Sequence, residues 1–272
     1  MKFKTLLSSV QGAFVPVALL LLWHFVATSG WVNPIILPAP LKVLQKWIDY
    51  ALPGEALLEG HSYFLWALSG ELWSDAVASL YRVFAGFAIG TGLALPLGLL
   101  MGADERVYRL FDPLVQVLRP IPPIAYIPLA ILWFGLGNPP AVFLISIGAF
   151  FPVLMNTIAG VRHVDGLYIR AARNLGAGKL TLFWRIMLPA ATPYILTGMR
   201  IGVGTAFIVV IVSEMIAVNS GLGYRILEAR EFLWSDKIIA GMISIGLLGL
   251  AIDTSMNRLN RHLLRWHRGV ND

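Results

Sequence analysis

The sequence predicts an all-α, polytopic membrane protein with six transmembrane helices. Of its 272 residues, 57% are hydrophobic and only 13% are charged, and the mean hydropathy is +0.73. A soluble domain of this length would not contain so much apolar surface in one core. Long apolar runs separated by short charged segments support the same prediction, because a helix needs about 20 residues to cross a bilayer. The chain has no cysteine, which excludes disulfides and thiolate metal sites.

Six apolar runs are the candidate spans. They cover residues 12–28, 77–101, 112–135, 140–161, 191–216 and 238–256. The first run follows Lys2 and Lys4 and could also be a signal peptide. Trp23 and His24 within it, and Trp31 just beyond it, favour a retained helix with an interfacial anchor.

Charge asymmetry predicts the side of the membrane on which the connecting segments lie. Residues 29–75 hold five acidic residues against two lysines, and we expect them outside, with a short interfacial helix. Residues 162–189 and the tail are rich in arginine, which predicts that both are cytoplasmic, as is the amino terminus. The expected parts are 1–75, with the first span and the external segment, 76–258, with the five other spans, and 259–272, the basic tail.

A polar, basic segment interrupts the apolar chain and is the best clue to function. Arg170-Ala171-Ala172 is followed by Gly176 and then, ten residues further on, by Ile186-Met187-Leu188-Pro189. Alanines and a glycine flanked by cations predict a short helix and a tight turn, whose small residues permit close approach by another protein. We expect a docking hairpin here rather than a catalytic site.

The third span contains Arg119-Pro120-Ile121-Pro122-Pro123. Three prolines in four positions cannot maintain the helical hydrogen-bond ladder, so we expect the helix to break there. Broken backbone at membrane depth is tolerated where it is buried in protein or lines a wet cavity. The segment is therefore a candidate wall of a permeation path. The alternative is a structural kink with Arg119 snorkelling to the interface.

Arg200 and Glu214 are two charges in the fifth span. Fourteen residues of helix leave them about 40° apart around the axis and about 21 Å apart along it, so they share a face without touching. That face should point to the bundle, to a partner copy or to the headgroup layer, and snorkelling at both ends is the alternative to cavity lining. Asp253, near the end of the last span, is expected to pair with an arginine such as Arg258.

Other functional classes find little support. The five histidines have no metal-ligand spacing. The segment from Gly176 to Thr181 looks like part of a phosphate loop, but that motif would need glycine at position 173 and Ser or Thr at position 180, where this chain has Arg173 and Leu180. We therefore expect neither a metal nor ATP on this chain. The net charge of +6 is spread over short segments, which favours positive-inside topology over nucleic-acid binding.

Several motifs, in order along the chain, resemble the nitrate/sulfonate/taurine subgroup of ABC importer permeases. The hairpin is similar to the coupling motif E-A-A-x3-G-x9-I-x-L-P, with Arg170 in place of the glutamate. The other matching stretches are RPIPPIAYIPLAILWFG from Arg119 to Gly135, Thr197 to Gly202, Ser213 to Ala217 and Ile36 to Pro40. The resemblance extends over roughly residues 34–268.

The resemblance implies a type I ABC importer permease of the bacterial inner membrane. Two copies would form the pathway for a small anion or sulfonate, two cytoplasmic ATPases using ATP and Mg would bind the hairpins, and an external binding protein would deliver the ligand. The implied coupling residues are Arg170, Ala171, Ala172, Gly176, Ile186, Leu188 and Pro189. The pathway candidates are Arg119, Pro120, Pro122, Pro123, Arg200 and Glu214. An intramembrane enzyme using Glu214, Asp253 or a histidine, or an ion channel that conducts without ATP, is the alternative.

Overall fold

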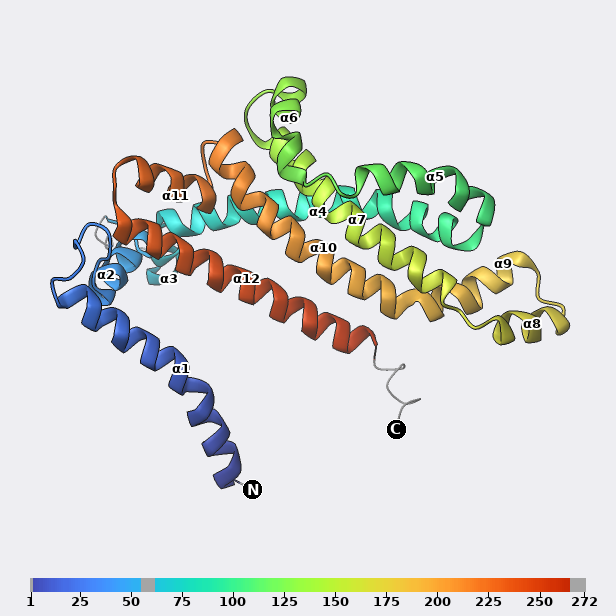
Figure 1. The fold of residues 1–272 in the computed structure, drawn as a ribbon, viewed down its shortest axis with the longest axis horizontal. Helices are drawn as coiled ribbons and strands as arrows, with labels where there is room; N and C mark the ends of the chain where they lie inside the picture. Colours follow the sequence, from blue (N-terminus) through green and yellow to red (C-terminus); the bar gives the residue numbers. More distant parts are fainter. Residues whose placement is uncertain (1, 55–61, 265–272) are drawn as a thin grey trace. The chain divides into compact units, whose positions relative to one another are not determined.

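The structure is a computed structural model that describes residues 2–54 and 62–264. Over these ranges the chain is helical and contains no strand (Figure 1). The last eight residues of the predicted tail, with Arg265 and Arg268, lie outside the described residues, as do His61 and His267. The predicted all-α class is confirmed for the part of the chain that is described.

The elements follow one another as α1 (Lys2–Thr28), α2 (Pro40–Ala51), α3 (Tyr63–Ala67), α4 (Glu71–Ala103), α5 (Glu105–Leu118), η1 (Pro123–Tyr126), α6 (Ile127–Phe134), α7 (Asn138–Arg162), α8 (Gly166–Asn174), α9 (Lys179–Leu182), η2 (Phe183–Met187), α10 (Leu188–Ala217), α11 (Leu222–Glu231) and α12 (Ser235–Leu263). They form two compact units. The terminal unit comprises residues 1–75 and 225–246, and the core unit comprises residues 76–224 and 247–272.

Four of the predicted spans appear as helices long and apolar enough to cross a membrane: α4, α7, α12 and the continuous helix from Lys179 to Ala217 that ends with α10. A fifth is a broken pair, in which α5 and the segment from Pro123 to Phe134 meet at 82°. The apolar part of α1, Phe14–Thr28, is shorter. The count of six is compatible with these helices and stays a prediction.

The bend between α5 and α6 lies where the prolines predicted it. Helix α5 ends at Leu118, and Pro122 has an extended backbone immediately before η1. The predicted break of the third span is therefore confirmed. Its start is not where the apolar run suggested, because α5 begins at Glu105 with Asp104 as its N-cap, accepting the Arg106 N–H at 2.8 Å.

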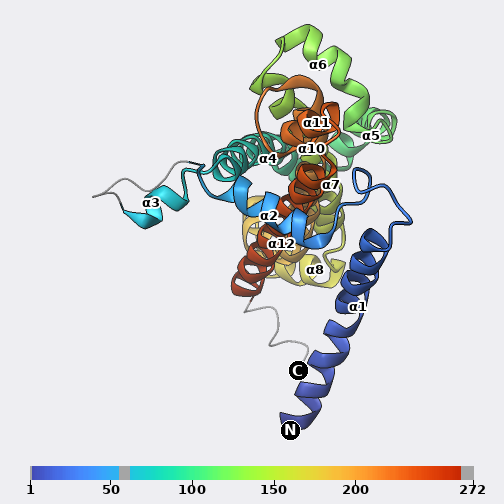
Figure 2. The same cartoon turned by 90° about the vertical axis from the view of Figure 1, so that its left-hand side faces the viewer.

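Helix α7 is the centre of the core unit. Leu144, Ile145, Ala149, Val153 and Leu154 along it are all fully buried. Figures 1 and 2 both show α7 alongside α10. Glycines permit the close packing: a Cβ on the α4 residue Gly86 or on the α10 residue Gly198 would lie 2.6 Å from a side-chain carbon of α7. The broken segment and the hairpin are attached to this tightly packed helix pair.

Candidate coupling hairpin and pathway groove

The predicted helix and tight turn are present as α8 and the residues after it. Asp165 caps α8 by accepting the Leu167 N–H at 2.8 Å. At the other end, the Gly176 N–H donates to the Arg173 carbonyl at 2.9 Å and the Ala177 N–H donates to the Ala172 carbonyl at 3.0 Å. This pair of bonds is a Schellman motif, which requires a left-handed residue, and Gly176 supplies it with φ +82°.

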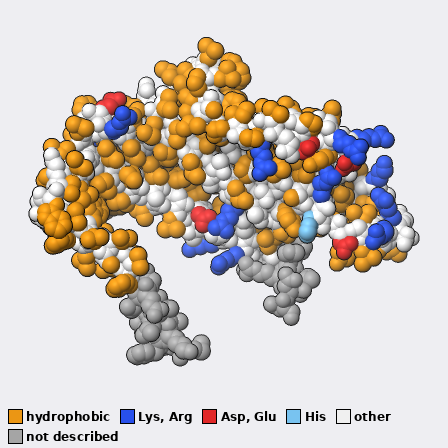
Figure 3. Space-filling model, viewed as in Figure 1, with side chains coloured by type: hydrophobic (Ala, Val, Ile, Leu, Met, Phe, Trp, Pro, Cys, Tyr) orange, Lys and Arg blue, Asp and Glu red, His pale blue; other side chains and the backbone are white. Residues whose placement is uncertain are grey.

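The outgoing half of the hairpin is exposed. Arg170, Ala171 and Gly176 lie at the surface and Ala172 is half-buried. The side chain of Leu175 is 88% exposed beside the turn. Figure 3 shows Lys and Arg side chains gathered at the end of the core unit that carries α8 and α9. Leu167, Tyr168 and Leu180 of the same hairpin are exposed as well, and apolar side chains exposed together mark interaction sites more often than a single one does.

The returning half is anchored instead. Ile186, Leu188 and Pro189 are half-buried, and Leu188 packs against the cluster of Val161, Ala191 and Ile195. The π-helical segment η2 lies directly before Leu188 and Pro189, where the missing proline N–H removes a regular helical bond. The implied coupling residues therefore fall into two sets: Arg170 to Gly176, which is exposed except for the half-buried Ala172, and Ile186 to Pro189, which is half-buried.

The broken segment forms a groove with α7 and α10. Its volume is about 390 Å³, and Arg119, Pro122 and Pro123 line it together with Asn156 of α7 and Thr205 of α10. The sequence had placed Arg119, Pro120, Pro122 and Pro123 at the wall of a path. Pro120 is exposed and is not among the residues that line this groove.

Arg200 and Glu214 do not line this groove. Arg200 forms a bidentate pair with Asp253 of α12, with Nε–Oδ1 at 3.0 Å and Nη2–Oδ2 at 3.1 Å, and both side chains are about half exposed. The expected arginine partner of Asp253 is therefore Arg200 rather than Arg258. Although Arg200 and Glu214 were predicted to share a face of the helix, they pair with different residues: Arg200 with Asp253, and Glu214 with Arg82.

Glu214 lies at the centre of a buried ion pair that sequence reasoning missed. Its carboxylate accepts from Arg82 Nη1 at 2.6 Å, from Ser79 Oγ at 3.0 Å and from the Gly223 N–H at 2.9 Å. Arg82 also donates to Asn138 Oδ1 at 2.7 Å and, through Nη1 and Nη2, to the carbonyl and hydroxyl oxygens of Ser220. The signal was available: Arg82 is a charge inside an apolar run, and a buried charge requires a partner.

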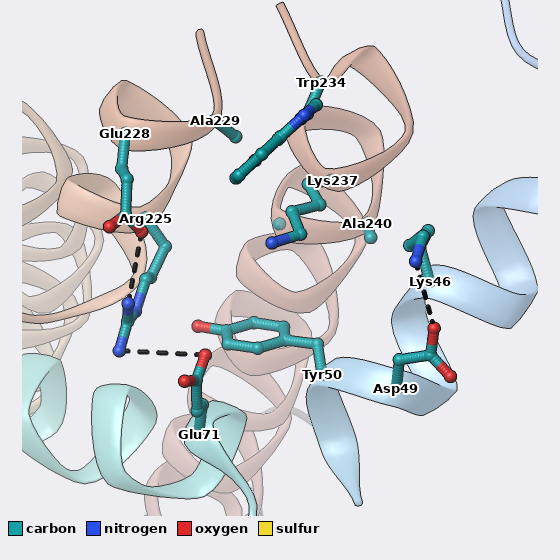
Figure 4. A pocket seen from close by; sticks show the side chains of 11 residues that line it. Lys46, Asp49, Tyr50, Glu71, Arg225, Glu228, Ala229, Trp234, Lys237 and Ala240 are labelled. Atoms are coloured by element: carbon teal, nitrogen blue, oxygen red, sulfur yellow. Dashed lines mark hydrogen bonds and ion pairs between the residues drawn. The ribbon is translucent and has the colours of Figure 1, made fainter. Parts of the chain in front are cut away.

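The terminal unit contains a second polar hollow, of about 200 Å³ (Figure 4). Arg225 pairs there with Asp75 at 2.7 Å, Glu228 at 3.1 Å and Glu71 at 3.8 Å. The Tyr50 hydroxyl donates to Asp75 at 2.9 Å, and burial together with this carboxylate raises the pKa of Tyr50. These contacts join α2, α11 and the start of α4. Arg225 therefore links these elements through ion pairs, which is a structural role.

The described residues contain no group of three or more His, Asp or Glu side chains placed to hold a metal ion.

Comparisons with known proteins give the same family as the motifs. Residues 94–269 match the family described as the binding-protein-dependent transport system inner membrane component. The taurine transport system permease protein TauC of Escherichia coli K12 is 36% identical over 93% of this chain and 88% of that protein. The putative aliphatic sulfonates transport permease protein SsuC of Bacillus subtilis 168 is 35% identical over 94% and 87%. The nitrate import permease protein NrtB of Synechocystis sp. PCC 6803 is 32% identical over 90% and 85%.

A solved structure shows that the fold is shared as well. A chain of the MetNI methionine ABC transporter in an inward-facing conformation superposes with a TM-score of 0.59 at 19% identity, over 74% of this chain and 99% of that chain. The predicted type I importer permease fold is therefore confirmed. With a family match over most of its length and relatives of the same architecture, this chain belongs to the inner membrane components of binding-protein-dependent transport systems.

Proposed function

We propose that this chain is the membrane-spanning permease subunit of an ATP-driven importer for a small anion or sulfonate. The exposed hairpin around Gly176, attached to a membrane-spanning helix pair, carries this proposal. The relatives are permeases for taurine, aliphatic sulfonates and nitrate, which supports an importer subunit without catalytic activity of its own rather than an intramembrane enzyme or an ion channel.

In the proposed assembly two copies of the chain form the pathway in the inner membrane. Two cytoplasmic ATPases, which use ATP and Mg, bind the two hairpins, and an external binding protein delivers the ligand. ATP binding closes the ATPase pair and moves the hairpins together, and the core units then repack between two states. Co-purification of the ATPase with the permease, and ATP-dependent uptake by vesicles that contain both, test this function.

Arg170 should contribute to ATPase docking as a cation. It is exposed on the same hairpin as the basic residues Arg173 and Lys179, which suits an acidic partner surface. Arg170→Glu should therefore weaken ATPase binding by about tenfold at low salt, and less at high salt, because exposed charges are screened. Co-purification across a salt series measures this effect. An improved interaction would show that the partner surface is built for glutamate instead.

The topology predicts which side of the membrane two exposed residues face. In this cysteine-free chain, Ser62→Cys should react with an impermeant maleimide in intact cells. Lys179→Cys should react only after the membrane is opened, because it lies in the hairpin that the ATPase binds. Labelling of residue 179 but not of residue 62 in intact cells would show that the orientation is the opposite of the one proposed, with both termini outside the cytoplasm.

A further inference from the structure

The groove beside the broken segment combines one cation with apolar walls. Resting on the proposed permease function, we propose that this groove takes an organic monoanion, with one anionic headgroup on an apolar body, in preference to a bare inorganic anion or a zwitterion. The headgroup contacts Arg119, and the body lies along the walls.

Arg119 is available to a ligand. Its backbone N–H donates to the Val115 carbonyl oxygen at 2.9 Å at the end of α5. Its guanidinium is exposed and has no carboxylate within ion-pair distance among the described residues, unlike Arg82, Arg200 and Arg225. A free guanidinium presents a planar pair of donors that matches the geometry of carboxylate, sulfonate and phosphate oxygens.

The other polar groups of the groove provide no counter-charge for an amine. Asn156 donates through Nδ2 to the Pro152 carbonyl at 2.8 Å, and Thr205 donates through Oγ1 to the Ile201 carbonyl at 3.0 Å. Neither side chain is charged, and no acidic residue lines the groove. An ammonium group entering it would lose hydration without gaining a carboxylate, which disfavours a zwitterion.

The remaining walls favour an apolar body. Ile121, Phe151, Met155 and Ile201 line the groove around Arg119. A second hollow of about 260 Å³ shares Pro122, Pro123 and Thr205 with it and is lined mostly by apolar side chains, among them Ile124, Leu144 and Val212. An inorganic anion has no apolar part to bury against these walls, so they do not strengthen its binding. Each methylene group that a ligand buries there strengthens binding by about fourfold.

The test uses matched anions and the purified permease–ATPase complex in lipid nanodiscs, with empty nanodiscs as the partitioning control. Binding of ethanesulfonate, butanesulfonate, 2-aminoethanesulfonate and nitrate is measured by equilibrium dialysis. We expect butanesulfonate to bind about 15-fold more tightly than ethanesulfonate, because two further methylenes are buried. We expect 2-aminoethanesulfonate, which differs from ethanesulfonate by one amine, and nitrate to bind at least tenfold more weakly than ethanesulfonate.

Two substitutions locate the site. Arg119→Gln should weaken butanesulfonate binding by at least tenfold, whereas Arg200→Gln, the same change at a paired arginine outside the groove, should leave it unchanged. Ile201→Thr should reduce the difference between butanesulfonate and ethanesulfonate.

Equal affinities for the four anions in the wild-type complex would overturn the proposal without any variant, as would equal effects of the two arginine substitutions. A complex that assembles with the ATPase and imports another ligand, but binds no sulfonate, would refute the groove inference and leave the permease function standing. Failure of the wild-type permease to bind any ATPase would refute the function itself.

Discussion

Removing Glu214 should destabilise the core unit by about 3–5 kcal/mol, because a buried ion pair that loses one partner leaves an uncompensated charge in the interior. Arg82 and Glu214 are 3% and 0% exposed. In Glu214→Ala, Arg82 would stay buried with its hydrogen bonds to Asn138 and Ser220 but without a counter-charge. Denaturant unfolding of the purified protein in mixed micelles measures the loss.

A second ion pair on α10 provides the matched control. Arg200 and Asp253 also form a direct ion pair, with nitrogen and oxygen 2.9 Å apart against 2.6 Å for Arg82 and Glu214, but their side chains are 44% and 50% exposed. Arg200→Met should therefore cost no more than about 1 kcal/mol, whereas Arg82→Met should cost several times as much. The double variant Arg82→Met with Glu214→Met should recover much of the loss, since both charges are gone. Equal costs for the two arginines would show that Arg82 is not held as a buried charge.

Substituting Gly176 with leucine should abolish coupling to the ATPase while leaving the membrane helices folded. The residue has φ +82°, where a side chain strains the backbone by roughly 1–2 kcal/mol. Apart from its two chain neighbours, no described residue comes within 4 Å of a Cβ placed there. The fold therefore has room for the side chain, and the damage arises from a distorted turn and from bulk on the docking surface. ATPase co-purification and transport-linked ATP turnover measure the effect.

Neighbouring substitutions separate the two causes. Gly176→Asn should retain much of the coupling, because asparagine tolerates the left-handed conformation better than leucine or alanine does. Gly178 also has open space around it, but its φ is −72°, which any residue can adopt. Gly178→Ala should therefore leave coupling to the ATPase unchanged, whereas Gly176→Ala should reduce it. Normal coupling in Gly176→Leu would contradict the assignment of this turn to the ATPase contact.

The sequence predicted those features that depend on local chemistry. Pro120, Pro122 and Pro123 predicted the break after α5, since three prolines within four positions cannot maintain the helical hydrogen-bond ladder. A single proline is tolerated inside α4, α5, α7 and α10. The small residues around Gly176 predicted the turn for a similarly local reason. The pair of Arg82 and Glu214 was missed because its members are 132 residues apart, and periodicity carries no information about which helices meet. Counting opposite charges inside apolar runs would have suggested it.

The start of α5 and the grouping of the terminal unit were missed for other reasons. The first half of α5 carries Glu105, Arg106, Arg109 and Asp112, whereas the second half, from Pro113 to Leu118, has no charge. A hydropathy window therefore finds only the second half of the helix. Residues 225–246 group with residues 1–75 through contacts such as that of Arg225 with Asp75, and nothing in the order of the chain indicates this return.

The returning half of the hairpin is the first part of one continuous helix that runs from Lys179 to Ala217. Its 39 residues correspond to about 58 Å at 1.5 Å per residue. The other connection of the hairpin, from Arg162 to Gly166, contains the non-helical residues 163–165 and is not a continuous helix. A displacement of the hairpin is therefore expected to pass along this one helix, which packs against α7. It would reach the other end of the helix close to Glu214 and its ion pair with Arg82.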